Sequence, residues 1–483
     1  MTKTPELPGS SPRHPSRPAT ASDHRVAVTR RGFLASAVVA VGAGRLPWPL
    51  AMQPHPARRP VPSPSQLLWQ HDELALFVHF GVNTFTSREW GDGREDPSIF
   101  APAALDTRQW VRAARTAGFR AMILTAKHHD GFCLWPTRTT THSVARSPWR
   151  DGEGDLVREF TDACRAEGLR AGLYCSPWDR NAPSYGDSPR YDDVYSTQLT
   201  ELLTNYGPIH EVWFDGANGE GPNGRRQVYD WDRYWGLVRR LQPEAVIFSD
   251  AGPDVRWIGN ERGVAGETNW STMDPDAVPF PGATGDHVIR ALQEGDPAGT
   301  VWRPGETDVS IRPGWFYHAD QDARVKSVDD LVDIYFTSVG RNSKLLLNVP
   351  PTRDGLLHDT DVARLAGMHT RLGAIFERDL TDRRAPAWRR TGERTGVAEL
   401  DLGRAVTIAV ADLREDIEQG QAVARYVFEG SNGDSWQTLS NGTTIGYRKL
   451  DRFAPTRVRR VRVIVDDAVD VPGPIRIGLY APV

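Results

Sequence analysis

The chain has 483 residues, of which 39% are hydrophobic and 25% are charged, and its formal net charge is −4. These values are typical of a globular protein with two or three domains, and they exclude the strongly basic surface that binds nucleic acid. The three cysteines lie in or beside apolar runs and form no Cys-x-x-Cys pair. We therefore expect buried free thiols, without a disulfide framework or a cysteine metal site.

The N-terminal residues have the layout of an export signal. Two consecutive arginines, Arg30 and Arg31, precede an apolar run from Ala35 to Gly44, and the residues up to Ala51 provide a candidate cleavage site. This order is typical of a twin-arginine signal, and the apolar run is too short to span a bilayer. We predict a twin-arginine export signal over residues 1–51, a Pro-rich linker over 52–66, and a secreted protein without stable membrane insertion.

Residues 67–377 alternate between strand and helix patterns. Apolar runs typical of strands buried on both faces occur at residues 74–81, 121–126, 171–174, 209–216, 245–248 and 345–349. Helical periodicity occurs at residues 106–118, 155–168, 197–205, 230–241, 328–338 and 359–376. Strands that alternate with helices form a parallel sheet, so we predict a (β/α)8-like TIM barrel. The Gly- and Pro-rich residues 273–304 are expected to be a long loop that shapes a pocket.

The pattern changes at about residue 378. Short alternating runs, separated by Gly, Asn, Asp and Pro, continue to the end of the chain at residues 407–410, 424–428 and 458–465. This pattern predicts an antiparallel β-sandwich domain over residues 378–483. Such a domain either binds carbohydrate or supports the barrel, and alternation alone favours support because it identifies no ligand.

Side chains at the ends of the predicted barrel strands are candidates for chemistry, because these barrels build their active sites there. Asp215 ends one strand, where the alternative is an Asp that only caps a turn. Imidazole and aromatic groups end neighbouring strands, and acidic residues follow the fifth strand. His side chains read sugar hydroxyl groups and Trp stacks on sugar rings, so the set favours a sugar site: His79, His128, His129, Tyr174 and Trp213.

An alternative interpretation of the same residues is a metal-dependent hydrolase, whose metal would be bound by His79, His128, His129 and Asp215. Barrel hydrolases with a metal generally use a His-x-His pair on one strand. Because adjacent residues on a strand alternate in direction, we expect His128 and His129 to point in different directions. We therefore expect no metal and no other cofactor.

Six short segments resemble, in the same order, the α-L-fucosidases of glycoside hydrolase family 29. They are His79–Gly81, Glu89–Trp90, His128–Phe132, Trp213–Gly216, Arg312–Tyr317 and Leu346–Pro351. Residues 257–270 and 312–317, together with the C-terminal sandwich, are most similar to the subgroup that acts on α-1,3/1,4-linked fucose in Lewis-type glycans. The resemblance implies a hydrolase that removes terminal α-linked L-fucose from a fucosylated oligosaccharide or glycoconjugate.

The resemblance also implies a retaining mechanism with two carboxyl groups. Asp215 matches the family nucleophile, and Glu261 is assigned as the acid/base, with Glu267 and then Glu89 as rivals. The implied fucose-binding residues are His79, Glu89, Trp90, His128, His129, Tyr174, Trp213 and Trp315. A catalytically silent fucose-binding barrel is the alternative function, and the presence of both candidate carboxylates argues against it.

Overall fold

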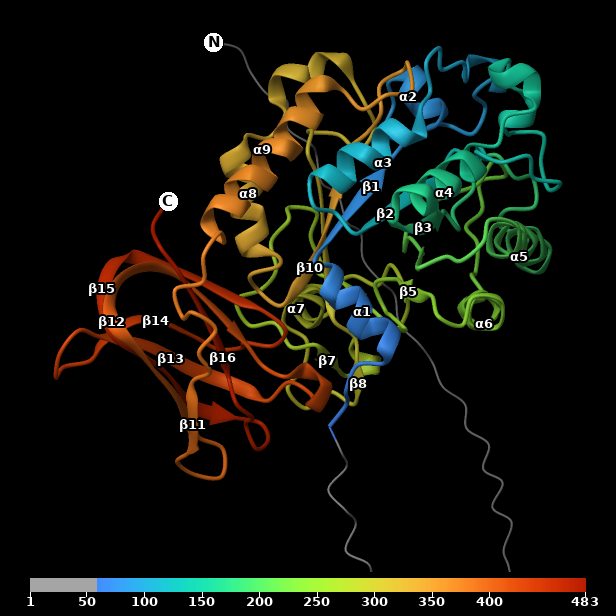
Figure 1. The fold of residues 1–483 in the computed structure, drawn as a ribbon. Helices are drawn as coiled ribbons and strands as arrows, with labels where there is room; N and C mark the ends of the chain where they lie inside the picture. The colour runs from blue at the N-terminus through green and yellow to red at the C-terminus, as the bar shows by residue number, and fades with distance from the viewer. Residues whose placement is uncertain (1–58) are drawn as a thin grey trace, which may run out of the picture. The chain divides into compact units, whose positions relative to one another are not determined.

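The structure is a computed structural model that describes residues 59–483. The predicted export signal lies outside these residues. A parallel barrel is followed by an antiparallel β-domain (Figure 1). In the described part of the chain, no helix combines the length and apolar character needed to cross a membrane.

Eight parallel strands form the barrel, in the order β5-β4-β3-β2-β1-β10-β9-β6. The two end strands meet only through a bridge between Phe248 and Val255, so the barrel is nearly closed. This architecture confirms the predicted (β/α)8-like fold. The strands are β1 (Leu74–Val78), β2 (Ala121–Lys127), β3 (Arg170–Cys175), β4 (Glu211–Trp213), β5 (Val246–Phe248), β6 (Arg256–Trp257), β9 (Gly305–Ser310) and β10 (Ser343–Asn348).

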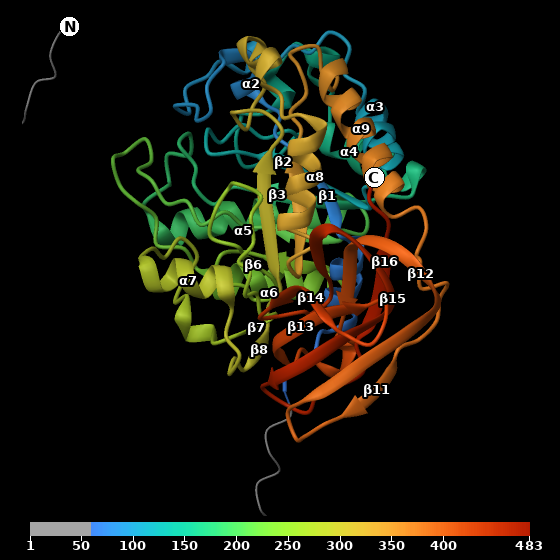
Figure 2. The same cartoon turned by 90° about the vertical axis from the view of Figure 1, so that its left-hand side faces the viewer.

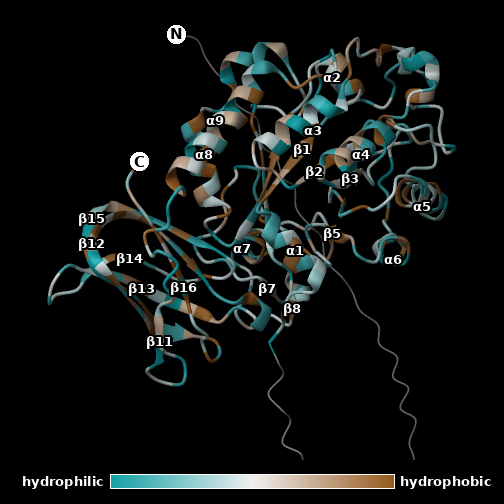
Figure 3. Cartoon of the chain, in the orientation of Figure 1, coloured by the Kyte–Doolittle hydropathy of each residue, from teal (hydrophilic) through white to brown (hydrophobic). Residues whose placement is uncertain are grey.

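Helices connect most of these strands, and several begin at a side chain that caps the first turn. Asp106 caps α3 and Asp155 caps α4 by accepting backbone hydrogen bonds, as the sequence patterns predict. The helices are α1 (Pro64–Asp72), α2 (Val82–Thr86), α3 (Thr107–Thr116), α4 (Leu156–Glu167), α5 (Ser188–Asn205), α6 (Trp231–Leu241), α7 (Asp286–Glu294), α8 (Val328–Thr337) and α9 (Asp359–Ile375). Apolar residues concentrate on the central strands β1 and β2, whereas α9 has a mixed surface (Figure 3).

Four local features of the structure differ from the predictions. Residues 273–304 are not a structureless loop, because they contain helix α7 and pair β7 (Thr272–Met273) with β8 (Val301–Trp302). Helix α5 begins at Ser188, well before the predicted start at residue 197, and α1 begins at Pro64 inside the predicted linker because Ser63 and Gln66 form a capping box. Strand β9 was not predicted, because Glu306 and Asp308 interrupt its apolar pattern.

Charged side chains inside the barrel are paired beneath the site. The Lys344 ammonium lies 2.9 Å from the Glu211 carboxylate, which also accepts a hydrogen bond from the Trp69 indole. The Glu306 carboxyl accepts a 2.9 Å bond from Trp213 Nε1. Buried polar groups need such partners, and these bonds hold the floor of the site in one arrangement.

The C-terminal domain is antiparallel, as predicted, and its strands follow the order β11-β12-β15-β13-β14, with β16 on β12. Pairing between β12 and β15 shifts register near Asp401 and near Ile408, and the two long strands curve through the domain (Figure 2). One apolar core fills this domain. The strands are β11 (Ala387–Arg390), β12 (Gly396–Arg414), β13 (Val423–Ser431), β14 (Gln437–Gly442), β15 (Lys449–Ala468) and β16 (Arg476–Tyr480).

Polar contacts join this domain to the barrel. Arg448 lies 2.7 Å from the Glu73 carboxylate at the start of β1, and the Tyr447 hydroxyl donates to the same carboxylate at 3.0 Å. On another loop, the backbone N–H of Asn269 donates to Thr444 at 2.9 Å. The C-terminal domain therefore contacts the barrel before β1 and at the loop that contains Asn269.

Candidate active site

All of the predicted site residues line one cavity of about 410 Å³ at the carboxyl ends of the barrel strands. A space of this size suits a single sugar unit. The lining contains both candidate catalytic carboxyl groups and the complete predicted binding set: Asp215, Glu261, His79, Glu89, Trp90, His128, His129, Tyr174, Trp213 and Trp315.

Asp215 is the second residue after β4, and neighbouring donors orient its carboxylate. The Tyr174 hydroxyl donates to Oδ2 at 3.0 Å, and the backbone N–H of Ala217 donates to Oδ1 at 2.7 Å. His129 Nε2 lies 3.8 Å from Oδ2. The side chain is 26% exposed, so it is both fixed and open to a ligand. Donors on both oxygens stabilise the negative charge that a carboxylate nucleophile needs.

Glu261 follows β6 and reaches the same cavity. Burial raises the pKa of its carboxyl group, and the charges of Asp215 and Glu89 raise it further. A hydrogen bond from Trp315 Nε1, at 3.3 Å, acts in the opposite direction. A carboxyl group with a raised pKa beside an ionised carboxylate is the arrangement that separates an acid from a nucleophile.

The two rival acids, Glu267 and Glu89, are engaged in other contacts. The Glu267 side chain is 80% exposed, pairs with Arg341 at 3.3 Å, and lies outside both cavities at the barrel mouth. Glu89 lines the cavity, but its carboxylate accepts hydrogen bonds from the Trp315 backbone at 2.8 Å and from His318 at 2.6 Å. Glu89 therefore anchors the segment that carries Trp315.

Three histidines provide neutral hydrogen-bonding groups. Burial lowers the pKa of His79 to about 3, and burial also lowers the pKa of His128 and of His129. His79 Nδ1 lies 2.8 Å from Asn348, and His129 Nδ1 lies 2.7 Å from Ser176. These bonds fix the rings of His79 and His129 and leave the other nitrogen of each ring for a ligand, so a neutral ring can bind a hydroxyl group.

The expectation that His128 and His129 point in different directions is wrong. Both rings line the cavity, and their centroids are 4.1 Å apart. Strand β2 ends at Lys127, so the two histidines belong to the following turn and the alternation of a strand does not apply to them. Among the residues the structure describes, no group of three or more His, Cys, Asp or Glu side chains is arranged to hold a metal ion.

Aromatic side chains form the apolar walls. Trp213 stacks on Phe248 with ring centroids 4.1 Å apart, and the buried Glu306 holds its indole nitrogen. Trp90 is 59% exposed and meets His129 edge to face at the mouth. The walls therefore provide apolar contact for a ring or a methyl group, while the histidines provide polar contact.

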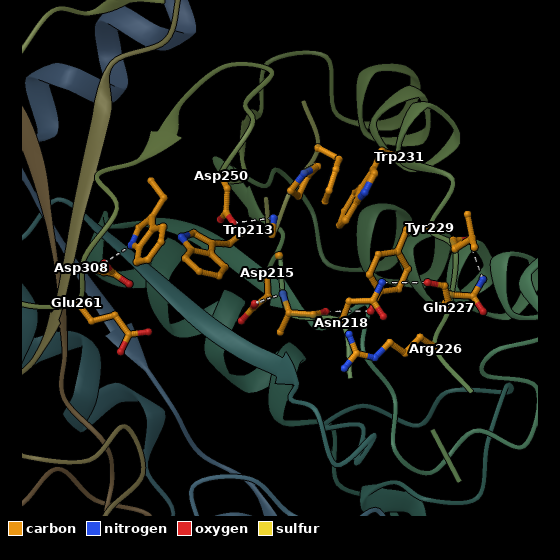
Figure 4. Close-up of a pocket in the computed structure, with 17 residues that line it drawn as sticks. Trp213, Asp215, Asn218, Arg226, Gln227, Tyr229, Trp231, Asp250, Glu261 and Asp308 are labelled. Atoms are coloured by element: carbon orange, nitrogen blue, oxygen red, sulfur yellow. Dashed lines mark hydrogen bonds between the residues drawn. The ribbon is translucent and has the colours of Figure 1, made fainter. Parts of the chain in front are cut away.

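A second cavity of about 710 Å³ opens beside the first and shares Asp215, Glu261 and Asp308 with it (Figure 4). Its outer wall carries polar and aromatic side chains that sequence reasoning missed, among them Asn218, Arg226, Tyr229, Trp231 and Phe280. The site therefore has room for a substrate that extends beyond one sugar.

Two further carboxyl groups in this region were also missed. Burial raises the pKa of Asp250 to about 7, with a further contribution from the charge of Asp215. Burial raises the pKa of Asp308 well above its usual range, and the charge of Glu261 adds to this. Asp250 follows the strand predicted at residues 245–248, so its position was a usable signal, whereas Asp308 lies in the strand that was not predicted.

Comparisons with known proteins show the family of this chain. The family model described as Alpha-L-fucosidase matches residues 94–374. Alpha-L-fucosidase 1 of Arabidopsis thaliana is 42% identical over 459 residues, which cover 89% of each chain.

Two solved structures extend the comparison. A glycoside hydrolase 29 family member from an unknown rumen bacterium is 41% identical with a TM-score of 0.81, over 88% of this chain and 78% of that one. A Ruminococcus gnavus GH29 fucosidase in complex with fucose is 31% identical with a TM-score of 0.79, over 89% of this chain and 97% of that one. The chain therefore belongs to the α-L-fucosidases of glycoside hydrolase family 29.

Proposed function

We propose that this α-L-fucosidase works by a retaining double displacement, in which Asp215 is the nucleophile and Glu261 is the acid/base. The observation that carries the proposal is that the two carboxyl groups line one sugar-sized cavity in different environments. Asp215 accepts hydrogen bonds on both oxygens, whereas burial raises the pKa of Glu261. This difference matches the two roles that a retaining glycosidase assigns to its carboxyl pair.

In the first step, a carboxylate oxygen of Asp215 attacks the anomeric carbon of fucose, and the bond to the leaving oxygen breaks. Glu261 gives its proton to that oxygen, which leaves a fucosyl ester on Asp215. In the second step, Glu261 takes a proton from water, whose oxygen attacks the anomeric carbon and releases Asp215. The two inversions together retain the configuration of the substrate.

The substrate proposed is a glycan with terminal α-1,3- or α-1,4-linked fucose. The second cavity supports a branched substrate, because it continues from the carboxyl pair and has aromatic and polar walls. A relative of known structure is in complex with fucose, which supports fucose as the unit held in the smaller cavity. Exposed Phe280 and Val228 on the outer wall provide apolar contact for the remaining sugars.

Proton NMR of the reaction tests both parts of this proposal. Lewis-type trisaccharides and 2′-fucosyllactose are supplied separately, and we expect the former to be cleaved at least about tenfold faster, because only they place a branch in the second cavity. The α anomer of L-fucose should appear first and then equilibrate with the β anomer. Initial release of the β anomer would contradict retention, and equal rates on the two substrates would contradict the linkage assignment.

We also propose that the protein is exported through the twin-arginine route, on the basis of Arg30, Arg31 and the apolar run that follows. A variant in which both arginines are replaced by lysine should remain in the cytoplasm, whereas the native protein should be exported. Fucosidase activity measured in separated cellular fractions gives the result. Equal export of both forms would contradict the assignment, and a variant with Arg58 and Arg59 replaced by lysine is the matched control.

A further inference from the structure

A third cavity lies between the barrel and the C-terminal domain. It has a volume of about 840 Å³, and none of its lining residues belongs to the two cavities at the barrel mouth. The barrel side is formed by Glu267, Arg341 and the end of α8. The other side is formed by β13, β14 and the first residues of β15. The established family assignment uses none of these residues.

Lys449, the first residue of β15, is the unusual group in this cavity. Its side chain lines the cavity, although the residue is only 7% exposed. Burial lowers the pKa of its ammonium, and the nearby charges of Asp451, Arg341 and Glu267 also act on it. Within residues 59–483, this ammonium forms no hydrogen bond and no ion pair with a protein group, and it is not fully enclosed, so it is open to the cavity that it lines. A cation that has lost most of its contact with water and has no protein partner is a position where a ligand anion would be stabilised.

The other charged groups of the cavity already have partners. Asp451 accepts hydrogen bonds from the hydroxyl groups of Tyr426 at 2.7 Å and Ser440 at 2.6 Å. The arginines are paired with carboxylates: Arg341 with Glu267 at 3.3 Å, Arg425 with Asp466 at 3.0 Å and Arg452 with Asp333 at 2.6 Å. Lys449 is therefore the cation of this cavity that is available to an anion.

The rest of the lining suits a ligand rich in hydroxyl groups. Strand β14 is at the edge of its sheet, and short polar residues of this strand and of the next turn line the cavity: Thr438, Ser440, Asn441 and Thr443. The volume is much larger than one inorganic anion requires. We propose that this cavity binds an anionic saccharide, whose sulfate or carboxylate pairs with Lys449 and whose hydroxyl groups contact β14. Only the choice of a sugar rests on the proposed function.

Calorimetric titration of the full chain tests the proposal with four probes: galactose 6-sulfate, glucuronic acid, galactose and inorganic sulfate. We expect at least one of the two charged sugars to bind, and galactose and inorganic sulfate to bind at least about tenfold more weakly. Lys449→Met should weaken binding of the charged sugar by at least about tenfold, because methionine has a similar shape but lacks the charged hydrogen-bond donor. Comparison of galactose 6-sulfate with glucuronic acid identifies the anionic group.

The matched control is Arg389→Met, which removes the same charge from an exposed position on β11 and should leave binding unchanged. Asn441→Ala should weaken binding of the charged sugar, although it removes no positive charge from the cavity. Turnover of a Lewis-type trisaccharide should stay within about twofold in all three variants, which separates this site from the catalytic proposal. Failure of both charged sugars to bind, their equal binding to Lys449→Met, or sulfate alone binding as tightly would overturn the inference.

Discussion

Replacing Asp215 with alanine should reduce kcat on an α-L-fucoside by about four orders of magnitude or more, because alanine cannot form the fucosyl ester. The measurement is single-substrate kinetics on α-L-fucosyl fluoride, whose leaving group needs little protonation. Added azide should restore part of the turnover by entering the space left by the carboxylate. The product is then expected to be β-L-fucosyl azide, since one displacement inverts the anomeric carbon.

Asp250 provides the matched control for this variant. It is also an aspartate near the end of a barrel strand, but it lines only the larger cavity and accepts a hydrogen bond from the Gly282 backbone at 2.8 Å. Asp250→Asn should leave the chemistry with the fluoride largely intact and give no fucosyl azide. Near-normal turnover by Asp215→Ala, in a protein with an unchanged thermal unfolding midpoint, would show that another residue forms the intermediate.

The general architecture of the barrel was predictable because its buried strands are strongly patterned. The runs that became β1, β2, β3 and β10 are continuous apolar segments with few interruptions, and their burial is nearly complete. His79, His128, His129 and Asp215 could be placed for the same reason, since they lie at or directly after the ends of predicted strands. The role of Asp215 is therefore interpretable from its place at the end of an apolar run. Glu89, Trp90, Glu261 and Trp315 were assigned through the family resemblance, because no predicted strand ends directly before them.

The features that could not be predicted from the sequence depend on contacts between distant segments of the chain. Strand β9 carries Glu306 and Asp308, whose burial is compensated by indole donors from Trp213 and Trp257. The local sequence pattern does not show those distant partners, so the two charged residues kept β9 from being predicted as a buried strand. The orientation of His128 and His129 likewise depends on β2 ending at Lys127, and strand boundaries are the least predictable part of an element.

The distinction between Glu261 and Glu267 also came from tertiary structure. Both follow the fifth predicted strand in similar Gly-rich surroundings, so sequence position favours neither strongly. The structure directs Glu261 into the sugar cavity beside Trp315 and directs Glu267 toward Arg341, on the side of the C-terminal domain. This separation makes Glu267 the natural control for the role of Glu261.

Replacing Glu261 with alanine should therefore have an effect that depends on the leaving group. For a Lewis-type trisaccharide, kcat/KM should fall by about 10²- to 10⁴-fold, the usual contribution of a general acid. For α-L-fucosyl fluoride, kcat/KM should change by less than about tenfold, because fluoride leaves without a proton. In the native protein, activity on the trisaccharide should decline as pH rises through the raised pKa of Glu261, and the variant should lose this decline.

Azide distinguishes this variant from the nucleophile variant. Without the base, the fucosyl ester on Asp215 should react slowly with water but readily with azide, which needs no deprotonation, so the product should be α-L-fucosyl azide. The two variants should therefore give fucosyl azides of opposite anomeric configuration. This difference distinguishes the nucleophile from the acid/base. Glu267→Ala should retain the native ratio of the two substrates, because its side chain lies outside the site. A leaving-group dependence in Glu267→Ala, together with its absence in Glu261→Ala, would reverse the assignment of the acid.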